Sequence, residues 1–167
     1  MGRLKATAGK NLAESPCPCG SGRGYGDCCG PFLAGAAVPE TAEQLMRSRY
    51  TAYVLRDRDW LLATWHPATR GSRIDLDDRV RWIGLEVLAT QGGGLGDTKG
   101  TVEFVAQYKM GGRAHRLHER SRFQRRNGDW MYMGGELDPD GPLRQNPETP
   151  DPEMTHPERT VKVASSE

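Results

Sequence analysis

The residues best suited to chemistry in this sequence are its four cysteines, which all fall between positions 17 and 29. They are Cys17, Cys19, Cys28 and Cys29. Four thiolates can fill the four tetrahedral positions around a zinc ion, with Zn–S bonds of roughly 2.3 Å. Because protein sulfurs would then occupy every position, no place is left for a catalytic water. We therefore predict one structural zinc ion per chain, bound by these four residues.

The segment between the two cysteine pairs also favours a metal-binding loop. It contains eight residues, enough for the chain to turn back on itself. Four of them are glycines, which adopt backbone angles that a β-carbon forbids: Gly20, Gly22, Gly24 and Gly26. Tyr25 is the one bulky side chain in the segment. We expect it to cover the metal site.

Two other uses of the cysteines compete with zinc. Two disulfides would account for all four residues, but nothing in the sequence directs the chain to an oxidising compartment, and a bridge between the adjacent Cys28 and Cys29 would be strained. A redox-active pair is the second alternative, since closely spaced thiols become reactive when their pKa is lowered. Redox chemistry needs two of the four cysteines and leaves the clustering of the others unexplained. The pattern favours zinc over both alternatives.

The cysteine segment resembles the SEC-C motif, a small zinc module found at the C-terminus of the preprotein-translocating ATPase and in many uncharacterised bacterial proteins. The motif runs C-x-C-G-S-G, two basic residues, tyrosine and a final C-C or C-H pair, and residues 17–30 read CPCGSGRGYGDCCG. The resemblance implies that the four cysteines are the metal ligands. Family members carry several lysines around the tyrosine, whereas Arg23 is the one basic residue of this segment. The smaller positive charge weakens the expectation of an acidic partner at this face.

The length of 167 residues predicts one ordinary domain with a small appendage, long enough to bury a core. Residues 1–137 carry 20 basic and 15 acidic side chains, whereas residues 138–167 carry 3 and 7, so a basic body precedes an acidic tail. The basic N-terminus is not followed by an apolar run, and no stretch approaches the ~20 apolar residues of a membrane span. We expect a soluble cytoplasmic protein without a membrane partner.

The patterning divides the chain into five parts. We predict a flexible lead-in at 1–15, the zinc motif at 16–32, a linker at 33–40, an α+β domain at 41–137, and a disordered, acidic, proline-rich tail at 138–167. Six of the eleven prolines fall in that tail, which has little apolar surface to bury. The metal module and the α+β domain are therefore expected to be separate folding units.

Two helices are predicted at the start of the α+β domain. Thr41, followed three residues later by Gln44, is a capping-box pattern, and apolar residues then recur at helical spacing as far as Val54. A second, shorter helix is expected to begin at Asp57 or Asp59 and to end before residue 67, which is a proline.

Four strands are predicted after the helices. Alternation of apolar and polar residues begins at residue 80, with Ile83, Leu85 and Val87 expected on one face. Further strands are predicted at 101–110, 114–126 and 129–137, joined by hairpin turns at residues 111–112, which are Gly-Gly, and 127–128, which are Asn-Gly. Helices followed by an antiparallel meander predict an α+β fold in which the helices cover one face of a curved sheet.

The order of these elements, with the phrases at 47–53, 64–70 and 118–123, resembles the YchJ family of uncharacterised bacterial proteins. Members join a SEC-C motif to a domain of the nuclear transport factor two superfamily, which is a cone of curved sheet closed by helices. The resemblance implies a pocket between sheet and helices. Related folds host dehydratases and isomerases.

Glu119 and His66 are the candidates for catalysis in such a pocket. Glu119 shares a strand face with Leu117 and Phe123, and a carboxylate among apolar groups can serve as a general base. The alternative that we favour is an ion pair between Glu119 and a cation such as Arg49, because buried acids are usually paired. His66 is expected to be an ordinary residue at a helix end.

Residues 99–126 carry eight Lys or Arg side chains against two Glu. Five of the arginines are expected to face solvent: Arg116, Arg120, Arg122, Arg125 and Arg126. They could meet RNA phosphates or an acidic protein, or simply form a solvated sheet face.

These observations favour a zinc-binding protein that acts as a docking or adaptor module for a macromolecular partner, either a protein or a ribonucleoprotein. The alternative is a small-molecule binder or a dehydratase-like or isomerase-like enzyme that uses the pocket of the cone. A common, solvent-connected cavity containing both Glu119 and His66 would favour the alternative. As a separate unit, the zinc motif is expected to unfold alone in a Cys19→Ser variant.

Overall fold

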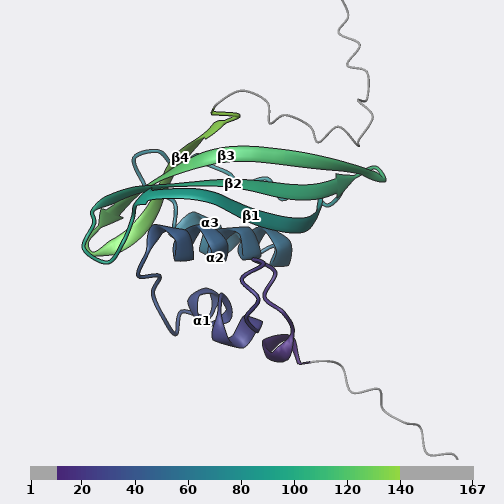
Figure 1. Ribbon diagram of the computed structural model, residues 1–167, viewed down its shortest axis with the longest axis horizontal. Coiled ribbons are helices and arrows are strands. Elements are labelled where there is room, and N and C mark those ends of the chain that lie inside the picture. The colour runs from purple at the N-terminus through teal and green to yellow at the C-terminus, as the bar shows by residue number, and fades with distance from the viewer. Residues whose placement is uncertain (1–10, 140–167) are drawn as a thin grey trace, which may run out of the picture.

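A four-stranded antiparallel sheet forms one layer of the structure and helices form the other, in a computed structural model that describes residues 11–139 (Figure 1). The elements are 3-10 helices η1 (Leu12–Glu14) and η2 (Tyr25–Asp27), helices α1 (Gly30–Leu33), α2 (Ala42–Leu55) and α3 (Arg58–Ala63), and strands β1 (Arg81–Gly92), β2 (Lys99–Met110), β3 (Arg113–Arg126) and β4 (Asp129–Leu137). Helices α2 and α3 lie against one face of the sheet, and α1 lies on the far side of α2. This arrangement confirms the predicted α+β fold.

Helix α2 begins at the predicted cap. The Thr41 hydroxyl accepts a hydrogen bond from the Gln44 N–H at 3.1 Å, and Gln44 Oε1 accepts one from the N–H of Glu40 at 2.7 Å. The first bond satisfies an N–H group that the first helical turn leaves without a carbonyl partner, and the second ties the residue before the cap to the helix. Of the two aspartates proposed to begin the next helix, Asp57 is the cap of α3, since its side chain accepts a hydrogen bond from the N–H of Trp60.

The strands follow each other in the order β1, β2, β3, β4, as a meander requires. The two predicted hairpin turns are confirmed by their backbone angles: φ is 58° and 78° at Gly111 and Gly112, and 53° and 91° at Asn127 and Gly128. Positive φ at both central residues is the conformation that matches the twist of the flanking strands.

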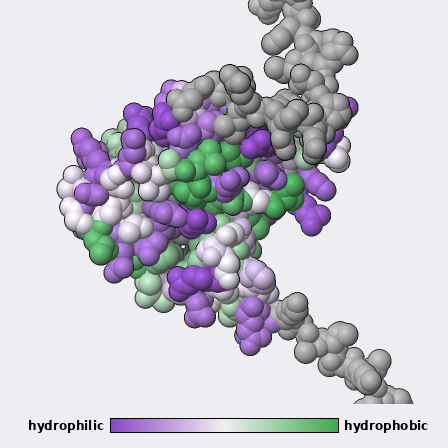
Figure 2. Space-filling model, in the orientation of Figure 1, coloured by the Kyte–Doolittle hydropathy of each residue, from purple (hydrophilic) through white to green (hydrophobic). Residues whose placement is uncertain are grey.

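Strand β1 departs from simple alternation. The prediction that Ile83 shares one face with Leu85 and Val87 is wrong, because the pairing with β2 shifts between Trp82 and Gly84 and leaves Ile83 unpaired. Ile83 is 42% exposed, whereas Trp82 and Leu85 pack against buried residues. Figure 2 shows a hydrophobic area on the side of the molecule that faces the viewer, where β1 lies. A second shift in the pairing with β2 follows Val87. Such bulges add a residue to one strand and bend it, which curves the sheet around α2.

Two short helices fall where the sequence predicted irregular chain. Helix η1 lies within the predicted lead-in at 1–15, and α1 crosses the predicted boundary between zinc motif and linker at residue 33. Pro31 in the first turn favours the start of α1, but elements of three or four residues have no periodicity to reveal them. Residues 1–10 of the lead-in, and the tail from residue 140, lie outside the described residues. Within residues 11–139, no helix is long and apolar enough to cross a bilayer.

The core joins the cysteine segment to the α+β domain. One buried cluster fills the space between α2 and the sheet, with Leu45, Met46 and Val102 among its members. A second contains three of the cysteines together with Tyr50 of α2 and Ala106 of β2. The two parts of the chain therefore share buried contacts.

Candidate metal centre and cavity

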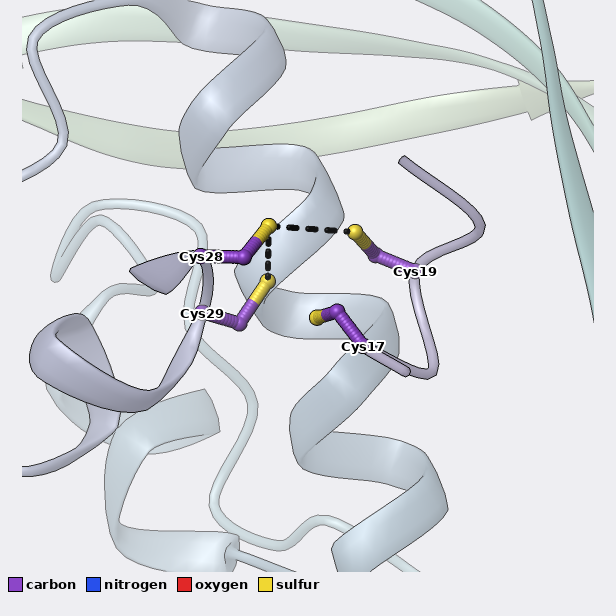
Figure 3. Close-up of side chains that lie close together, drawn as sticks. All are labelled: Cys17, Cys19, Cys28 and Cys29. Atoms are coloured by element: carbon purple, nitrogen blue, oxygen red, sulfur yellow. Dashed lines mark hydrogen bonds between the residues drawn. The ribbon is translucent and has the colours of Figure 1, made fainter. Parts of the chain in front are cut away.

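The four cysteine sulfurs converge on one point beside α2 (Figure 3). All four Sγ atoms lie within 4.8 Å of one another, with Cys19 to Cys28 at 3.6 Å and Cys28 to Cys29 at 4.0 Å. Zn–S bonds of roughly 2.3 Å in a tetrahedron place sulfurs about 3.8 Å apart. The cysteines are free, so the disulfide alternative is not what the structure contains. The donor set fits a single tetrahedral metal ion.

A tight loop presents the first two sulfurs. The N–H of Cys17 donates to the carbonyl of Arg23 at 2.8 Å, and the N–H of Gly20 donates to the carbonyl of Cys17 at 3.2 Å. The chain reverses through Gly20 and Gly22, whose φ angles of 73° and 82° favour glycine. We call residues 16–30, which include this loop and the second pair of cysteines, the knuckle.

The second pair of cysteines leads into α1, and its surroundings are closely packed. A β-carbon at Gly30 would lie 2.7 Å from the carbonyl oxygen of Tyr25, so this position needs glycine. The Tyr25 ring packs against the cysteine cluster, as predicted. Burial, followed by the charge of Cys17, raises the pKa of Tyr25. Hydrogen bonds from the thiols of Cys17 and Cys29 lower the pKa of Cys19 well below its usual range.

Besides Tyr50, two polar side chains of α2 reach the knuckle, and sequence reasoning missed both. Arg47 Nη1 donates to the carbonyl of Cys19 at 2.8 Å, and its Nε is paired with Glu43 at 3.0 Å. Burial alone would lower the pKa of Arg47, but Glu43 and Cys19 outweigh it and raise the pKa. Thr51 Oγ1 lies 3.9 Å from the sulfur of Cys17. Arg47 adds a cation to the knuckle, whose own sequence carries Arg23 as its one basic residue. The spacing of four between Arg47 and Thr51, which places both on one face of the helix, was the signal available in the sequence.

Much of the knuckle is covered. Cys17, Cys19 and Cys29 are buried and Cys28 is half-buried, with its sulfur 3.1 Å from the hydroxyl of Ser21. Residues 20–23 are exposed and form the outer edge of the loop.

A cavity of about 210 Å³ lies between α2 and the inner face of the sheet. Glu119 lines it, together with Leu117 and Phe123 of the same strand face. His66 does not, because it lies beyond the end of α3, where its Nδ1 accepts a hydrogen bond from the N–H of Ala68 at 3.1 Å. The two candidate catalytic residues are therefore not brought together.

The favoured ion pair between Glu119 and Arg49 is not formed. Glu119 Oε1 accepts hydrogen bonds from the hydroxyls of Ser121 at 2.6 Å and Tyr132 at 3.1 Å. Arg49 Nη1 donates to the Leu61 carbonyl and the Thr64 hydroxyl, both at 2.7 Å. The last turn of α3 draws the guanidinium away from the carboxylate. Within residues 11–139, no ion pair joins these two charges.

The expected row of five solvent-facing arginines is only partly present. Arg120 pairs with Glu103 at 2.8 Å. Arg125 lies over the Trp130 ring, 4.5 Å from its centre, and donates to the carbonyls of Asp97 and Gly128. The expectation for these two was wrong because neighbouring strands and loops supply partners that the sequence order conceals. Arg116, Arg122 and Arg126 are exposed.

Two protein-family models match the chain. The model described as the middle NTF2-like domain of YchJ matches residues 41–135, and the model of the SEC-C motif matches residues 15–31. A UPF0225 protein of Streptomyces coelicolor is 54% identical over 126 residues, covering 75% of this chain and 98% of that protein. A UPF0225 protein of Ralstonia nicotianae is 54% identical over 134 residues, covering 72% and 90%.

Two solved structures are also similar. A SEC-C motif containing protein from Rhodopseudomonas palustris, solved in solution, has a TM-score of 0.65 and 40% identity, covering 73% of this chain and 98% of that one. A SEC-C motif containing protein from Psychrobacter arcticus, solved by crystallography, has a TM-score of 0.61 and 28% identity, covering 84% and 90%.

Proposed function

This chain belongs to the YchJ (UPF0225) family, and we propose that it is a zinc protein whose knuckle docks a macromolecular partner. The observation that carries the proposal is the closed group of four sulfurs, which leaves no coordination position for chemistry. A closed metal site of this kind holds the surrounding loop in one conformation, so that the surface of the loop can bind a partner. The partner is expected to be a protein or a ribonucleoprotein.

Zinc is the ion that this donor set favours. Tetrahedral sites of four thiolates suit zinc or iron–sulfur clusters. Sulfurs within 4.8 Å of one another fit a single ion, whereas a cluster holds its cysteine sulfurs farther apart. Arg47 also offsets part of the negative charge that four thiolates on Zn²⁺ would leave.

Elemental analysis tests the metal assignment. Protein purified without chelator should contain one zinc per chain and no stoichiometric iron. Cys19→Ser should lose the zinc. Its matched control is Ser21→Ala, which should keep the zinc because Ser21 contacts the sulfur of Cys28 without being a ligand. A zinc content near zero in protein whose thiols remain reduced would contradict the proposal.

The docking role rests on the exposed outer edge of the knuckle. Residues 20–23 are exposed, and the loop is held to α2 by the hydrogen bond from Arg47. A loop already fixed in one conformation loses little entropy when it binds. Arg23, the charged side chain of this edge, is expected to contribute to partner recognition.

Affinity capture from cell extract with quantitative mass spectrometry tests this role. Arg23→Glu should reduce recovery of the partner at least tenfold while leaving the zinc content unchanged. Arg126→Glu makes the same change of charge at an exposed position far from the knuckle in sequence and should leave recovery unchanged. Equal recovery by all three proteins would contradict docking through the knuckle.

A second candidate function, small-molecule binding, is favoured by a separate observation. The cavity contains a carboxylate that is not ion-paired within the described part of the chain, and it is lined mainly by apolar and aromatic groups. Clefts of this character, with few and converging polar groups, are where small molecules bind.

A further inference from the structure

We infer that the cavity binds a small, planar, neutral molecule with an amide-like edge, meaning a hydrogen-bond acceptor and a donor side by side. The inference rests on the second candidate function and names the ligand class for it. Arg49 of α2 and Glu119 of β3 both line the cavity and are the two groups that would bind this edge.

Arg49 supplies the donors. Its side chain is 6% exposed and its guanidinium lies over the Tyr132 ring, 4.4 Å from the centre. Nη1 is used by α3, and within residues 11–139 Nε and Nη2 have no hydrogen-bond partner. Burial lowers the pKa of Arg49. A buried guanidinium with unused N–H groups gains from an acceptor that enters the cavity.

Glu119 supplies the acceptor. Its Oε1 already receives two hydroxyl hydrogen bonds, which fix the orientation of the carboxylate. Within residues 11–139, Oε2 has no such partner, so this oxygen can accept from a ligand N–H.

The two charges together select a neutral ligand. Their sum is zero, and within residues 11–139 each is hydrogen-bonded to other groups and no ion pair joins the two. A charged ligand would be attracted by one group and repelled by the other, and would lose its hydration on entering. A carboxamide or lactam places its carbonyl against a donor and its N–H against an acceptor, so that both buried groups are satisfied.

The walls set the shape and size of the ligand. Aromatic rings surround the polar groups: Tyr50, Tyr53, Trp82, Phe104, Phe123 and Tyr132. Such rings stack on planar molecules. The volume of about 210 Å³ compares with the roughly 150 Å³ of an engineered cavity that holds benzene. A molecule of one or two rings therefore fits.

Four probes with the same ring and different edges test the inference. Benzamide is neutral with acceptor and donor, benzoate is an anion, benzamidine is a cation and toluene has no polar edge. Each is titrated, to about 10 mM as suits fragments, into the isotopically labelled, zinc-loaded full chain, and binding is followed by NMR. We expect benzamide to bind at least tenfold more tightly than each of the other three. The ranking in the unmodified protein requires no variant to fold.

A variant then tests the role of the carboxylate. Glu119→Gln keeps the size of the side chain and removes its negative charge, so benzoate should gain at least tenfold relative to benzamide. Glu86→Gln makes the same change at an exposed position on β1 and should preserve the original ranking. If no probe binds, small-molecule binding in the cavity is itself wrong. If benzoate, benzamidine or toluene binds as tightly as benzamide, the ligand class is wrong while the cavity remains a binding site.

Discussion

Replacing Cys19 by serine should remove the metal and lower the unfolding free energy of the whole α+β domain by about 4 kcal/mol or more. Zinc binding supplies roughly 10 kcal/mol or more of folding free energy in isolated knuckle peptides. Here the cysteines also share a buried cluster with Tyr50 and Ala106, so loss of the knuckle uncovers part of the domain core. From the sequence we expected the knuckle to unfold alone. Because of this shared cluster, we now expect the α+β domain to lose stability with it.

Denaturant unfolding followed by tryptophan fluorescence measures this effect, because Trp82 packs against the same cluster. The midpoint should fall for Cys19→Ser and, by the same amount, for the unmodified protein treated with a chelator. Ser21→Ala should retain both metal and midpoint. A Cys19→Ser protein that has lost zinc but unfolds at the original midpoint would show that knuckle and domain are energetically independent.

Replacing Arg49 by methionine should lower the unfolding free energy by about 3 kcal/mol. The change leaves the Leu61 carbonyl without its donor and removes the cation from the face of the Tyr132 ring. An unsatisfied buried acceptor costs about 1 to 3 kcal/mol, and a desolvated cation–π contact contributes up to about 2. Methionine fills similar volume, so the loss reports on the polar contacts.

Arg58→Met is the matched control, since Arg58 is exposed in the first turn of α3 and its loss should change stability by less than about 0.5 kcal/mol. Thermal and denaturant unfolding of both variants give the comparison. If Arg49→Met is as stable as Arg58→Met, the contacts of the guanidinium with α3 and Tyr132 do not stabilise the fold.

Much of the fold follows from local sequence. The Thr41 cap and the turns at Asn127 and Gly128 depend on groups a few residues apart, so their chemistry is visible in the sequence itself. The faces of β3 were also predicted, because Leu117, Glu119 and Phe123 alternate without interruption. In β1 the same reasoning failed, since a bulge inverts the alternation and is recognised only from the partner strand.

The sequence by itself determined that four thiols would meet, because their spacing and the glycines between them allow one tight loop. Tertiary structure alone decided what surrounds that loop and the cavity. Packing brings Arg47 to Cys19, 28 residues away. It also directs Arg49 to the end of α3, so that Glu119 accepts hydrogen bonds from two hydroxyls and is not paired with Arg49. Contacts of this kind depend on which buried groups compete for one donor, and that competition exists only once the helices lie on the sheet.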